Sequence, residues 1–286
     1  MKPPPFLYAR PESIEEAVAV LVEHGDEARP LAGGQSLVPM LNYRLARPEV
    51  LVDLARVETL RVMTEHGGGW SVGATTTHAE LGRNGDLVAN CGLVGKAVPY
   101  IGHLQIRARG TVGGSVAHAD PAAELPAVAL AVDATVVAEG PGGRRNIAAD
   151  EFFVGPYANG LAEGELLVSV EFPKLPVGTL YLFDEFARRK GDFAVAGIAG
   201  IVEMSEDGVT VGSSRLTAFG IGGTPARLRA AEEVLVDRVL GQEAADEAGA
   251  AAAREVEPWD DNHGPATFRR QLISTMLRRS LMARAA

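Results

Sequence analysis

The chain has 286 residues, of which 47% are hydrophobic and 22% charged, and its net charge at pH 7 is −10. This length is sufficient for two or three small hydrophobic cores. The acidic charge argues against nucleic acid as a partner, because phosphate backbones attract basic surfaces. No apolar run is long enough to cross a bilayer, and the N-terminal stretch MKPPPFLYARPES lacks the apolar centre of a signal peptide. We therefore predict a cytoplasmic protein without membrane insertion.

Cysteine and histidine usage limits the metal chemistry of the chain. Cys91 is the single cysteine, so neither an intramolecular disulfide nor a cysteine-ligated zinc or iron–sulfur site can form from this chain alone. We interpret it as a buried small hydrophobe inside an apolar helix. The six histidines are scattered along the sequence. We predict no metal site.

Residues 1–56 are predicted to form a small α/β unit. Ser13 and Glu16 have the spacing of a capping box, and apolar residues at helical spacing follow until Gly25. A strand is predicted over 28–32, a short helix from Ser36, and a buried strand over 49–54.

Residues 57–174 are predicted to form a second α/β unit. A strand beginning at Trp70 runs into a second capping box at Thr77 and Glu80. One helix is predicted over 86–102. The stretches 127–140 and 164–173 each contain a strand.

Residues 175–286 have a different pattern. Three successive strands are predicted within 179–189, 192–205 and 209–220, with short turns between them. Helices are predicted over 225–240, 242–254 and 265–285. We therefore predict a C-terminal α+β domain, a three-stranded antiparallel sheet with helices packed on it.

The stretch AGGQS, residues 32–36, places two consecutive glycines, and therefore a backbone without side chains, within the first unit. Gly33 and Gly34 permit positive φ and the close approach of a ligand, and successive N–H groups can form an anion nest. Ser36 can cap the next helix and donate its hydroxyl to a phosphate. Taken alone, the stretch fits an ordinary tight turn equally well.

A second bare stretch, GTVGGS at residues 110–115, has a similar composition. Two such loops in adjacent units indicate one extended, doubly anionic ligand between them, and a dinucleotide pyrophosphate fits. Neither loop contains Lys or Arg, so N–H groups and hydroxyls are expected to hold the phosphates. Neither is a Walker loop. His103, His118, Arg107 and Arg109 flank the second loop, and we interpret them as surface or supporting groups rather than catalysts.

A third glycine-rich stretch, FGIGGTP at residues 219–225, resembles a dinucleotide-binding turn only superficially. Pro225 stands where the third glycine belongs. We interpret Thr224 and Pro225 as the N-cap and first residue of a helix.

Four ordered motifs resemble the FAD-binding medium subunit of molybdenum hydroxylases, the family of carbon monoxide dehydrogenase and of the flavin part of xanthine dehydrogenase. They are AGGQSLVPMLNYRLARPEVLVDL, VGATTTHAEL, QIRARGTVGGSVAHADPAAELP and RRKGDFAVAGIA. The resemblance covers essentially the whole chain. It implies a vanillyl-alcohol-oxidase-type FAD-binding fold, with two α/β subdomains gripping FAD and a C-terminal α+β domain.

The resemblance also implies which residues contact FAD. Ser115 stands where the family commonly has Asn, and Glu124 where it has Asp. Glu124 also fits a solvated acid at a helix start, and Phe193 also fits plain core. The implied contact residues are Ala32, Gly33, Gly34, Gln35, Ser36, Leu37, Ala74, Thr75, Thr76, Ile101, Gly110, Thr111, Val112, Gly113, Gly114, Ser115, Glu124, Leu167, Asp192 and Phe193.

The function implied is electron transfer. A molybdopterin-binding large subunit would hydroxylate the substrate, and an iron–sulfur small subunit would deliver electrons to the FAD of this chain, which passes them to an external acceptor. We identify no catalytic acid, base or nucleophile in the sequence. Arg188, Arg189 and Lys190 form a basic cluster that could dock the small subunit, or merely a solvated strand end. The alternatives are a self-contained FAD oxidoreductase with its own substrate and a non-enzymatic nucleotide-binding module.

Overall fold

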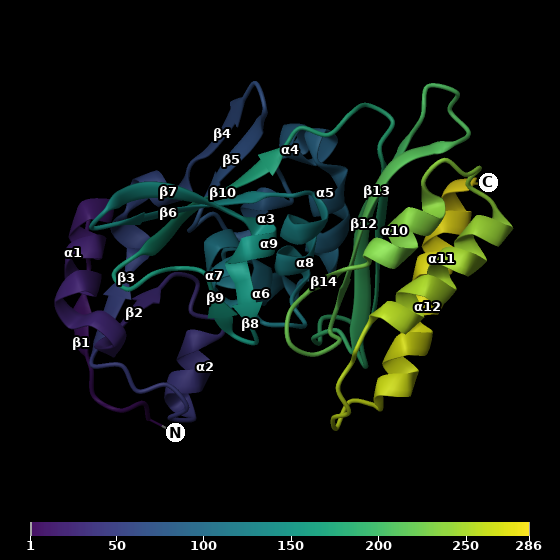
Figure 1. Cartoon of the computed structure of the whole chain (residues 1–286). Coiled ribbons are helices and arrows are strands. Elements are labelled where there is room, and N and C mark those ends of the chain that lie inside the picture. The colour runs from purple at the N-terminus through teal and green to yellow at the C-terminus, as the bar shows by residue number, and fades with distance from the viewer. Residues whose placement is uncertain (1, 286) are drawn as a thin grey trace.

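Three groups of elements lie side by side in the computed structural model, which describes residues 2–285 (Figure 1). The N-terminal elements lie at one end, a five-stranded sheet with short helices lies in the middle, and a four-stranded sheet backed by helices lies at the other end. Within residues 2–285, no helix has the length and apolar character needed to span a bilayer.

The first unit is built on a parallel sheet of order β1-β3-β2, as the predicted α/β unit requires. Ser13 caps the predicted helix by accepting from the Glu16 N–H at 3.1 Å. The carboxylate of Glu16 accepts instead from the Glu12 N–H at 2.8 Å, so only half of the predicted capping box forms. The elements are β1 (Leu7–Ala9), α1 (Ile14–His24), η1 (Gly25–Glu27), β2 (Ala28–Leu31), α2 (Leu37–Asn42), β3 (Val50–Asp53), η2 (Leu54–Arg56) and η3 (Glu58–Arg61).

The second unit is built on an antiparallel sheet of order β4-β5-β10-β6-β7. It therefore differs from a strict α/β unit, because the short β4–β5 and β6–β7 connections impose antiparallel neighbours. The second capping box is confirmed, since Thr77 and Glu80 exchange both bonds. The strands are β4 (Met63–His66), β5 (Gly69–Gly73), β6 (Thr135–Gly140), β7 (Gly143–Ala148) and β10 (Leu166–Pro173), with a separate pair, β8 (Phe153–Gly155) and β9 (Ala158–Asn159). The helices are α3 (His78–Leu81), α4 (Gly85–Asn90), α5 (Gly92–Ala97), η4 (Val98–Tyr100), α6 (Leu104–Arg107), α7 (Val112–His118), α8 (Glu124–Ala131) and α9 (Ala149–Phe152).

The predicted single helix over 86–102 is wrong in its continuity. Cys91 has non-helical dihedrals, φ −134° and ψ 74°, and separates α4 from α5. A Cβ atom at Gly92 would lie 2.5 Å from the ring of Tyr181, so the break packs bare backbone against the C-terminal sheet. Cys91 is buried as predicted, with 1% of its surface exposed.

The C-terminal sheet has four antiparallel strands, in the order β11-β12-β13-β14, rather than the predicted three. Residues 225–240 do not form one helix, because Ala226 and Arg227 pair with β13 before α10 begins. Thr224 and Pro225 thus precede a strand, and their interpretation as a helix start is wrong. The elements are β11 (Leu180–Phe186), β12 (Ala196–Met204), β13 (Val211–Phe219), β14 (Ala226–Arg227), α10 (Arg229–Leu235), α11 (Gln242–Glu255) and α12 (Ala266–Ala285).

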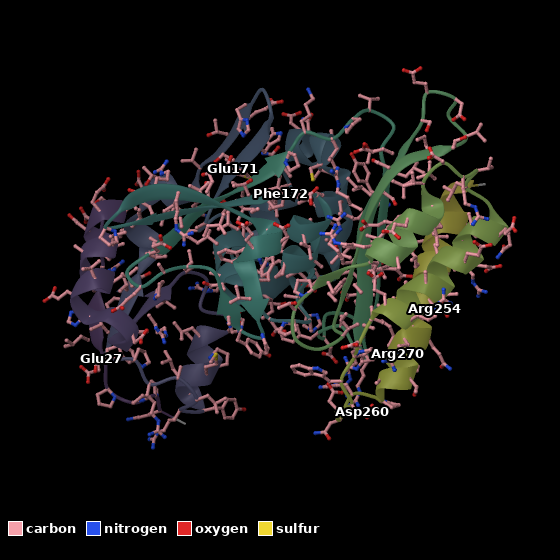
Figure 2. The ribbon with its side chains drawn as sticks, viewed as in Figure 1. Glu27, Glu171, Phe172, Arg254, Asp260 and Arg270 are labelled. Carbon is pink, nitrogen blue, oxygen red and sulfur yellow. The ribbon has the colours of Figure 1, made fainter. Side chains whose placement is uncertain are left out.

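Two hydrophobic cores hold these units. One is shared by the first two units and one face of the C-terminal sheet, which contributes Ala199, Ile201 and Phe219. The other lies between the remaining face of that sheet and its helices. On β10, buried Phe172 alternates with the more accessible Glu171 (Figure 2). An ion-pair link joins the second and third units, because Asp133 accepts from Arg215 at 3.1 Å and from Arg227 at 3.0 Å.

Candidate functional site

The first glycine stretch leaves its backbone donors free. It links the end of β2 to the start of α2, and Gly34 has φ +70°, which favours glycine. Within residues 2–285, the N–H groups of Gly34, Gln35 and Ser36 have no hydrogen-bond acceptor. The Ser36 hydroxyl does not cap α2, so the capping role predicted for it is wrong. These donors are therefore available to an anionic ligand.

In the second glycine stretch, the N–H groups of residues 112–115 are already bonded. Thr111 caps α7 through a bond from the Gly114 N–H at 3.1 Å. The Val112 N–H donates to the Thr76 carbonyl and the Gly113 N–H to the Ala74 carbonyl, each at 2.9 Å. The bonds do not support an anion nest at this stretch. The side chains of Thr111 and Ser115 and the bare glycine surface remain as its means of contacting a ligand.

The two stretches and the turn at residues 74–76 pack against one another. A Cβ atom at Gly33 would lie 2.2 Å from the Arg109 carbonyl oxygen and 2.8 Å from the Gly110 Cα. A Cβ atom at Gly113 would lie 2.5 Å from the Cβ of Ala74. Such distances exclude any side chain, so glycine at these positions is what permits the backbones to meet.

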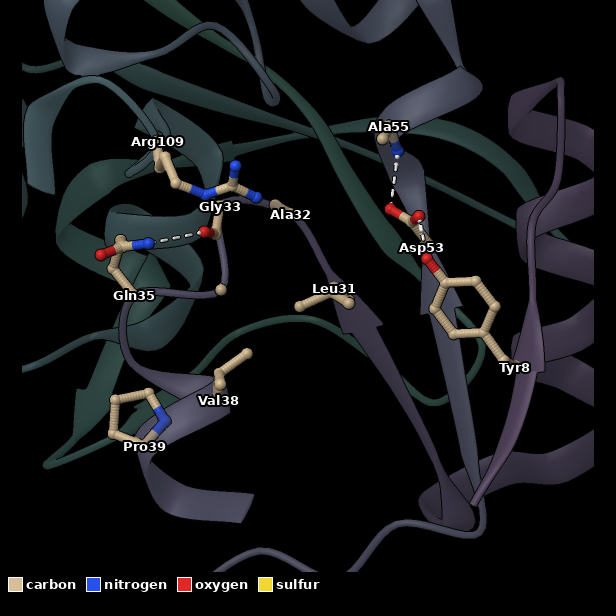
Figure 3. A pocket seen from close by; sticks show the side chains of 11 residues that line it. Tyr8, Leu31, Ala32, Gly33, Gln35, Val38, Pro39, Asp53, Ala55 and Arg109 are labelled. Carbon is tan, nitrogen blue, oxygen red and sulfur yellow. Dashed lines mark hydrogen bonds between the residues drawn. The ribbon is translucent and has the colours of Figure 1, made fainter. Parts of the chain in front are cut away.

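A pocket of about 500 Å³ opens beside this junction (Figure 3). The Arg109 side chain extends along its wall toward Gly33, on the same side as the Gln35 side chain, whose Nε2 donates to the Gly33 carbonyl at 3.1 Å. Arg109 is exposed, as its interpretation as a surface or supporting group requires, but the sequence did not indicate that it lines this pocket. The pocket is lined by Tyr8, Leu31, Ala32, Gly33, Gly34, Gln35, Val38, Pro39, Asp53, Ala55 and Arg109.

The opposite wall of the pocket carries an acid. Tyr8 donates its hydroxyl to Asp53, whose second oxygen accepts from the Ala55 N–H at 3.0 Å (Figure 3). Asp53 and Tyr8 were not predicted as site residues. Asp53 ends β3 and Tyr8 lies in the neighbouring parallel strand β1, and parallel strands bring their carboxyl ends to one edge.

A second group of predicted residues lies away from this pocket. Arg107 fixes the turn after η4 by donating to the carbonyls of Ile101 at 2.8 Å and Gly102 at 2.7 Å. A Cβ atom at Gly191 would lie 2.5 Å from the ring of His103. The loop that carries Asp192 and Phe193 is thereby held beside the segment that carries Ile101. Phe193 is 62% exposed, so it is not core.

Backbone hydrogen bonds connect the segments that carry Leu167, Thr75 and Thr76 to the junction of the two glycine stretches. The Val168 carbonyl, next to Leu167, accepts from the Ala74 N–H at 2.9 Å. The Thr75 N–H donates to the Leu60 carbonyl at 2.7 Å. Thr76 is fully buried, and its hydroxyl has no partner within the described residues.

Glu124 is buried rather than solvated, with 4% of its surface exposed at the start of α8. Burial raises its pKa to about 7, and nearby Asp120 adds to the shift. Burial and the neighbouring Glu124 raise the pKa of Glu185 on β11 to about 8. Glu124 is therefore an inward-facing acid between the second unit and the C-terminal sheet, and it does not line the Arg109 pocket.

Comparison with known families accounts for this arrangement. Residues 4–175 match the family described as the FAD binding domain in molybdopterin dehydrogenase, and residues 181–283 match the CO dehydrogenase flavoprotein C-terminal domain. The chain belongs to this family of FAD-binding medium subunits of molybdenum hydroxylases.

Relatives in this family resemble the chain over its whole length. It is 43% identical to the 6-hydroxypseudooxynicotine dehydrogenase complex subunit alpha of Paenarthrobacter nicotinovorans, with 98% of this chain and 95% of that protein covered. It is 38% identical to the carbon monoxide dehydrogenase medium chain of Hydrogenophaga pseudoflava, with 99% and 98% covered. A solved structure of carbon monoxide dehydrogenase from that organism, lacking the Mo-pyranopterin moiety, matches with a TM-score of 0.95 at 38% identity, covering 98% of this chain and 97% of that one.

The residues of this family member fit its flavin cofactor, FAD. The free N–H groups of residues 34–36 and the Arg109 guanidinium offer donors to a pyrophosphate on one wall of the pocket. Gly33 itself packs against the backbone of Arg109 and Gly110, and this contact brings the Arg109 side chain to the same wall. Among residues 2–285, no three His, Cys, Asp or Glu side chains gather in a way that could hold a metal ion.

Proposed function

We propose that the chain is the electron-transfer subunit of a heteromeric molybdenum hydroxylase. It takes electrons from the [2Fe–2S] clusters of a small partner subunit and passes them to an external acceptor, while a molybdopterin-binding large subunit hydroxylates the substrate. The observation that carries this proposal is the backbone junction of Gly33 with Arg109 and Gly110 beside a pocket of about 500 Å³. Such a junction suits a cofactor that bridges two units.

The division of labour between subunits follows from the cysteine content. One cysteine cannot ligate an iron–sulfur cluster, which takes four protein ligands. Burial also raises the pKa of the Cys91 thiol to about 12, so it is inert as a nucleophile. The relatives named above are a complex subunit and a medium chain, which supports assembly with other subunits.

FAD, when bound, supplies the redox chemistry, and the chain binds and orients it. In this proposal Ala32–Leu37 and Gly110–Ser115 hold the pyrophosphate, and Ile101, Asp192 and Phe193 lie at the flavin end. Leu167, Glu124 and the turn at 74–76 complete the set implied by the resemblance. The unit boundaries 1–56, 57–174 and 175–286, the vanillyl-alcohol-oxidase-type fold and a cytoplasmic location belong to the same proposal.

Purification tests this function directly. The chain is expressed with its neighbouring subunits, the complex is isolated, and its metals and acid-released flavin are identified. We expect FAD together with iron, sulfide and molybdenum in the complex. Reduced flavin should form on adding substrate to the complex and should not form with the isolated chain. Turnover of a small substrate by the isolated chain would favour a self-contained oxidoreductase, and absence of flavin would favour a simple nucleotide-binding module.

We further propose that the loop at residues 187–193 docks the small subunit. Arg188, Arg189 and Lys190 are all exposed, and Arg188 also donates to the Asn262 carbonyl at 2.6 Å. This bond fixes the direction of Arg188 without neutralising it, so Arg189 and Lys190 are the two cations free to reach a partner. Two exposed cations steer an acidic partner more than they add affinity. Replacing both with Ser should slow electron delivery at low salt by about threefold and leave the rate at high salt unchanged. If the variant and the wild type accept electrons at the same rate at low and at high salt, the pair has no role in docking.

A further inference from the structure

The wall of the pocket that faces the glycine stretch is built differently from the stretch itself. Asp53 is 7% exposed, and both of its oxygens have donors, Tyr8 and the Ala55 N–H (Figure 3). Arg10 approaches the carboxylate at 3.6 Å. Tyr8 is 52% exposed, so its ring presents an open face to the pocket. A carboxylate is thus held in a fixed direction, with spare lone pairs, at the end of a buried strand.

The two walls select different chemical groups. The free N–H groups of residues 34–36 and the guanidinium of Arg109 attract phosphate. Asp53 repels phosphate and accepts from hydroxyl or amino groups, as a carboxylate at a strand end does for a ribose. The exposed ring of Tyr8 offers a face on which a base can stack. The pocket therefore suits a ligand with phosphate at one end and a neutral nucleoside at the other.

We propose that Tyr8 and Asp53 bind the adenosine end of FAD and thereby make the site select a dinucleotide over FMN. This inference rests on the proposed function and deepens it. It also fixes the direction of the cofactor. The residues assigned to the flavin end, Ile101, Asp192 and Phe193, lie outside this pocket, so the adenosine end points into the first unit.

The two residues have separate tasks in this site. Asp53 accepts from the sugar hydroxyls or the base amino group. Tyr8 orients Asp53 and packs against the base. The hydrogen bond to Asp53 raises the pKa of the Tyr8 phenol above its usual range, as expected for a phenol that donates to a carboxylate. Ala55 holds the other oxygen, so Asn at position 53 can keep that bond while losing the charge.

Ligand binding to the full chain freed of flavin tests the inference. Affinities for FAD, FMN and ADP are measured for wild type, Asp53→Asn and Tyr8→Phe, by flavin fluorescence for the first two and by competition with FAD for ADP. Tyr43→Phe is the matched control, because Tyr43 is 71% exposed and lies outside the pocket lining. We expect Asp53→Asn to weaken FAD and ADP about tenfold, the effect of one hydrogen bond to a charged group, with FMN unchanged. Tyr8→Phe should weaken the same two ligands by a smaller factor.

Each other outcome overturns the inference. If wild type binds FAD but ADP does not compete, the pocket does not recognise adenosine. Unchanged FAD and ADP affinities in both variants remove Tyr8 and Asp53 from the site, although FAD binding and the proposed function survive. Equal loss of FAD, FMN and ADP assigns the residues to the fold, which the unfolding temperature checks. Failure of wild type to bind FAD refutes the proposed function itself.

Discussion

The two glycine stretches look alike in sequence and differ in what they offer a ligand. In the first, the N–H groups of Gly34, Gln35 and Ser36 are free beside the pocket. In the second, the N–H groups of Val112, Gly113 and Gly114 are bonded to Thr76, Ala74 and Thr111. The first stretch packs against another backbone at Gly33 and keeps free donors at residues 34–36, whereas the second is a packed helix start. A glycine pair thus indicates close approach, and only the structure says which N–H groups remain free.

The largest effect is expected from a substitution at the contact between the two glycine stretches. Gly33→Ala adds a Cβ 2.2 Å from the Arg109 carbonyl, so one backbone must move. We expect loss of FAD by at least a hundredfold in affinity, because the phosphate wall and Arg109 separate. The ratio of flavin to protein absorbance measures it. Gly67→Ala is the control, since a Cβ there meets nothing within 4 Å, and equal flavin content in both variants would contradict the junction.

The pH dependence of stability tests how tightly the second glycine stretch is packed over His78. His78 is buried under it, with Nε2 3.0 Å from the Thr111 carbonyl, and burial lowers its pKa from 6.5 to about 4. Between these values the unfolded chain binds a proton that the folded chain does not. The contribution of His78 is therefore complete above pH 6.5 and is lost as pH falls toward 4, by about 2–3 kcal/mol in the free energy of unfolding.

Urea unfolding of wild type and His78→Gln at pH 7 and pH 4 measures this contribution. Gln does not titrate and can still donate to Thr111. We expect the wild type to lose more stability than the variant on acidification. Parallel losses would mean that His78 is not held neutral by the packing of this stretch.

Valine at one glycine of each stretch separates binding from folding. Gly34→Val forces a branched residue into φ +70°, at a cost of about 1–2 kcal/mol, and covers the free donors. Gly114→Val places a Cβ 2.7 Å from the Thr111 hydroxyl and breaks the cap of α7, with a similar loss of stability. We expect flavin loss in both and loss of helix-start protection, by hydrogen exchange, only in the second. Identical hydrogen exchange at the start of α7 in the two variants would contradict the different roles of the two stretches.

The smallest effect is expected at Arg109. Arg109→Gln removes one exposed cation from the phosphate wall, and we expect FAD affinity to fall about fivefold at low salt and less at high salt. Arg83→Gln is the control, because Arg83 is exposed and bonds only the Ala79 carbonyl. An Arg109 effect no larger than the control's would leave the backbone donors as the sole phosphate contacts.

The sequence predicted most elements and the family, and the matches over residues 4–175 and 181–283 confirm FAD as the cofactor. It could not predict what tertiary contacts decide. The helix over 86–102 breaks where Gly92 meets Tyr181, and β14 exists because Arg227 pairs with β13. Arg109 joins the site only through its contact with Gly33, which no local pattern reports. Which of the implied residues touch FAD stays a prediction.

The Gly33–Gly110 contact also has a consequence for how the protein acquires its cofactor. These residues are far apart in the chain and lie in units that share one hydrophobic core. Contacts of large sequence separation form late, because the closure of long loops is entropically costly. Arg109, which is far in sequence from the rest of the pocket lining, therefore joins the pocket only once both units have docked, and we expect FAD to be captured at that stage. Cofactor loading thus reports the completion of folding, and bound FAD stabilises the finished fold by mass action.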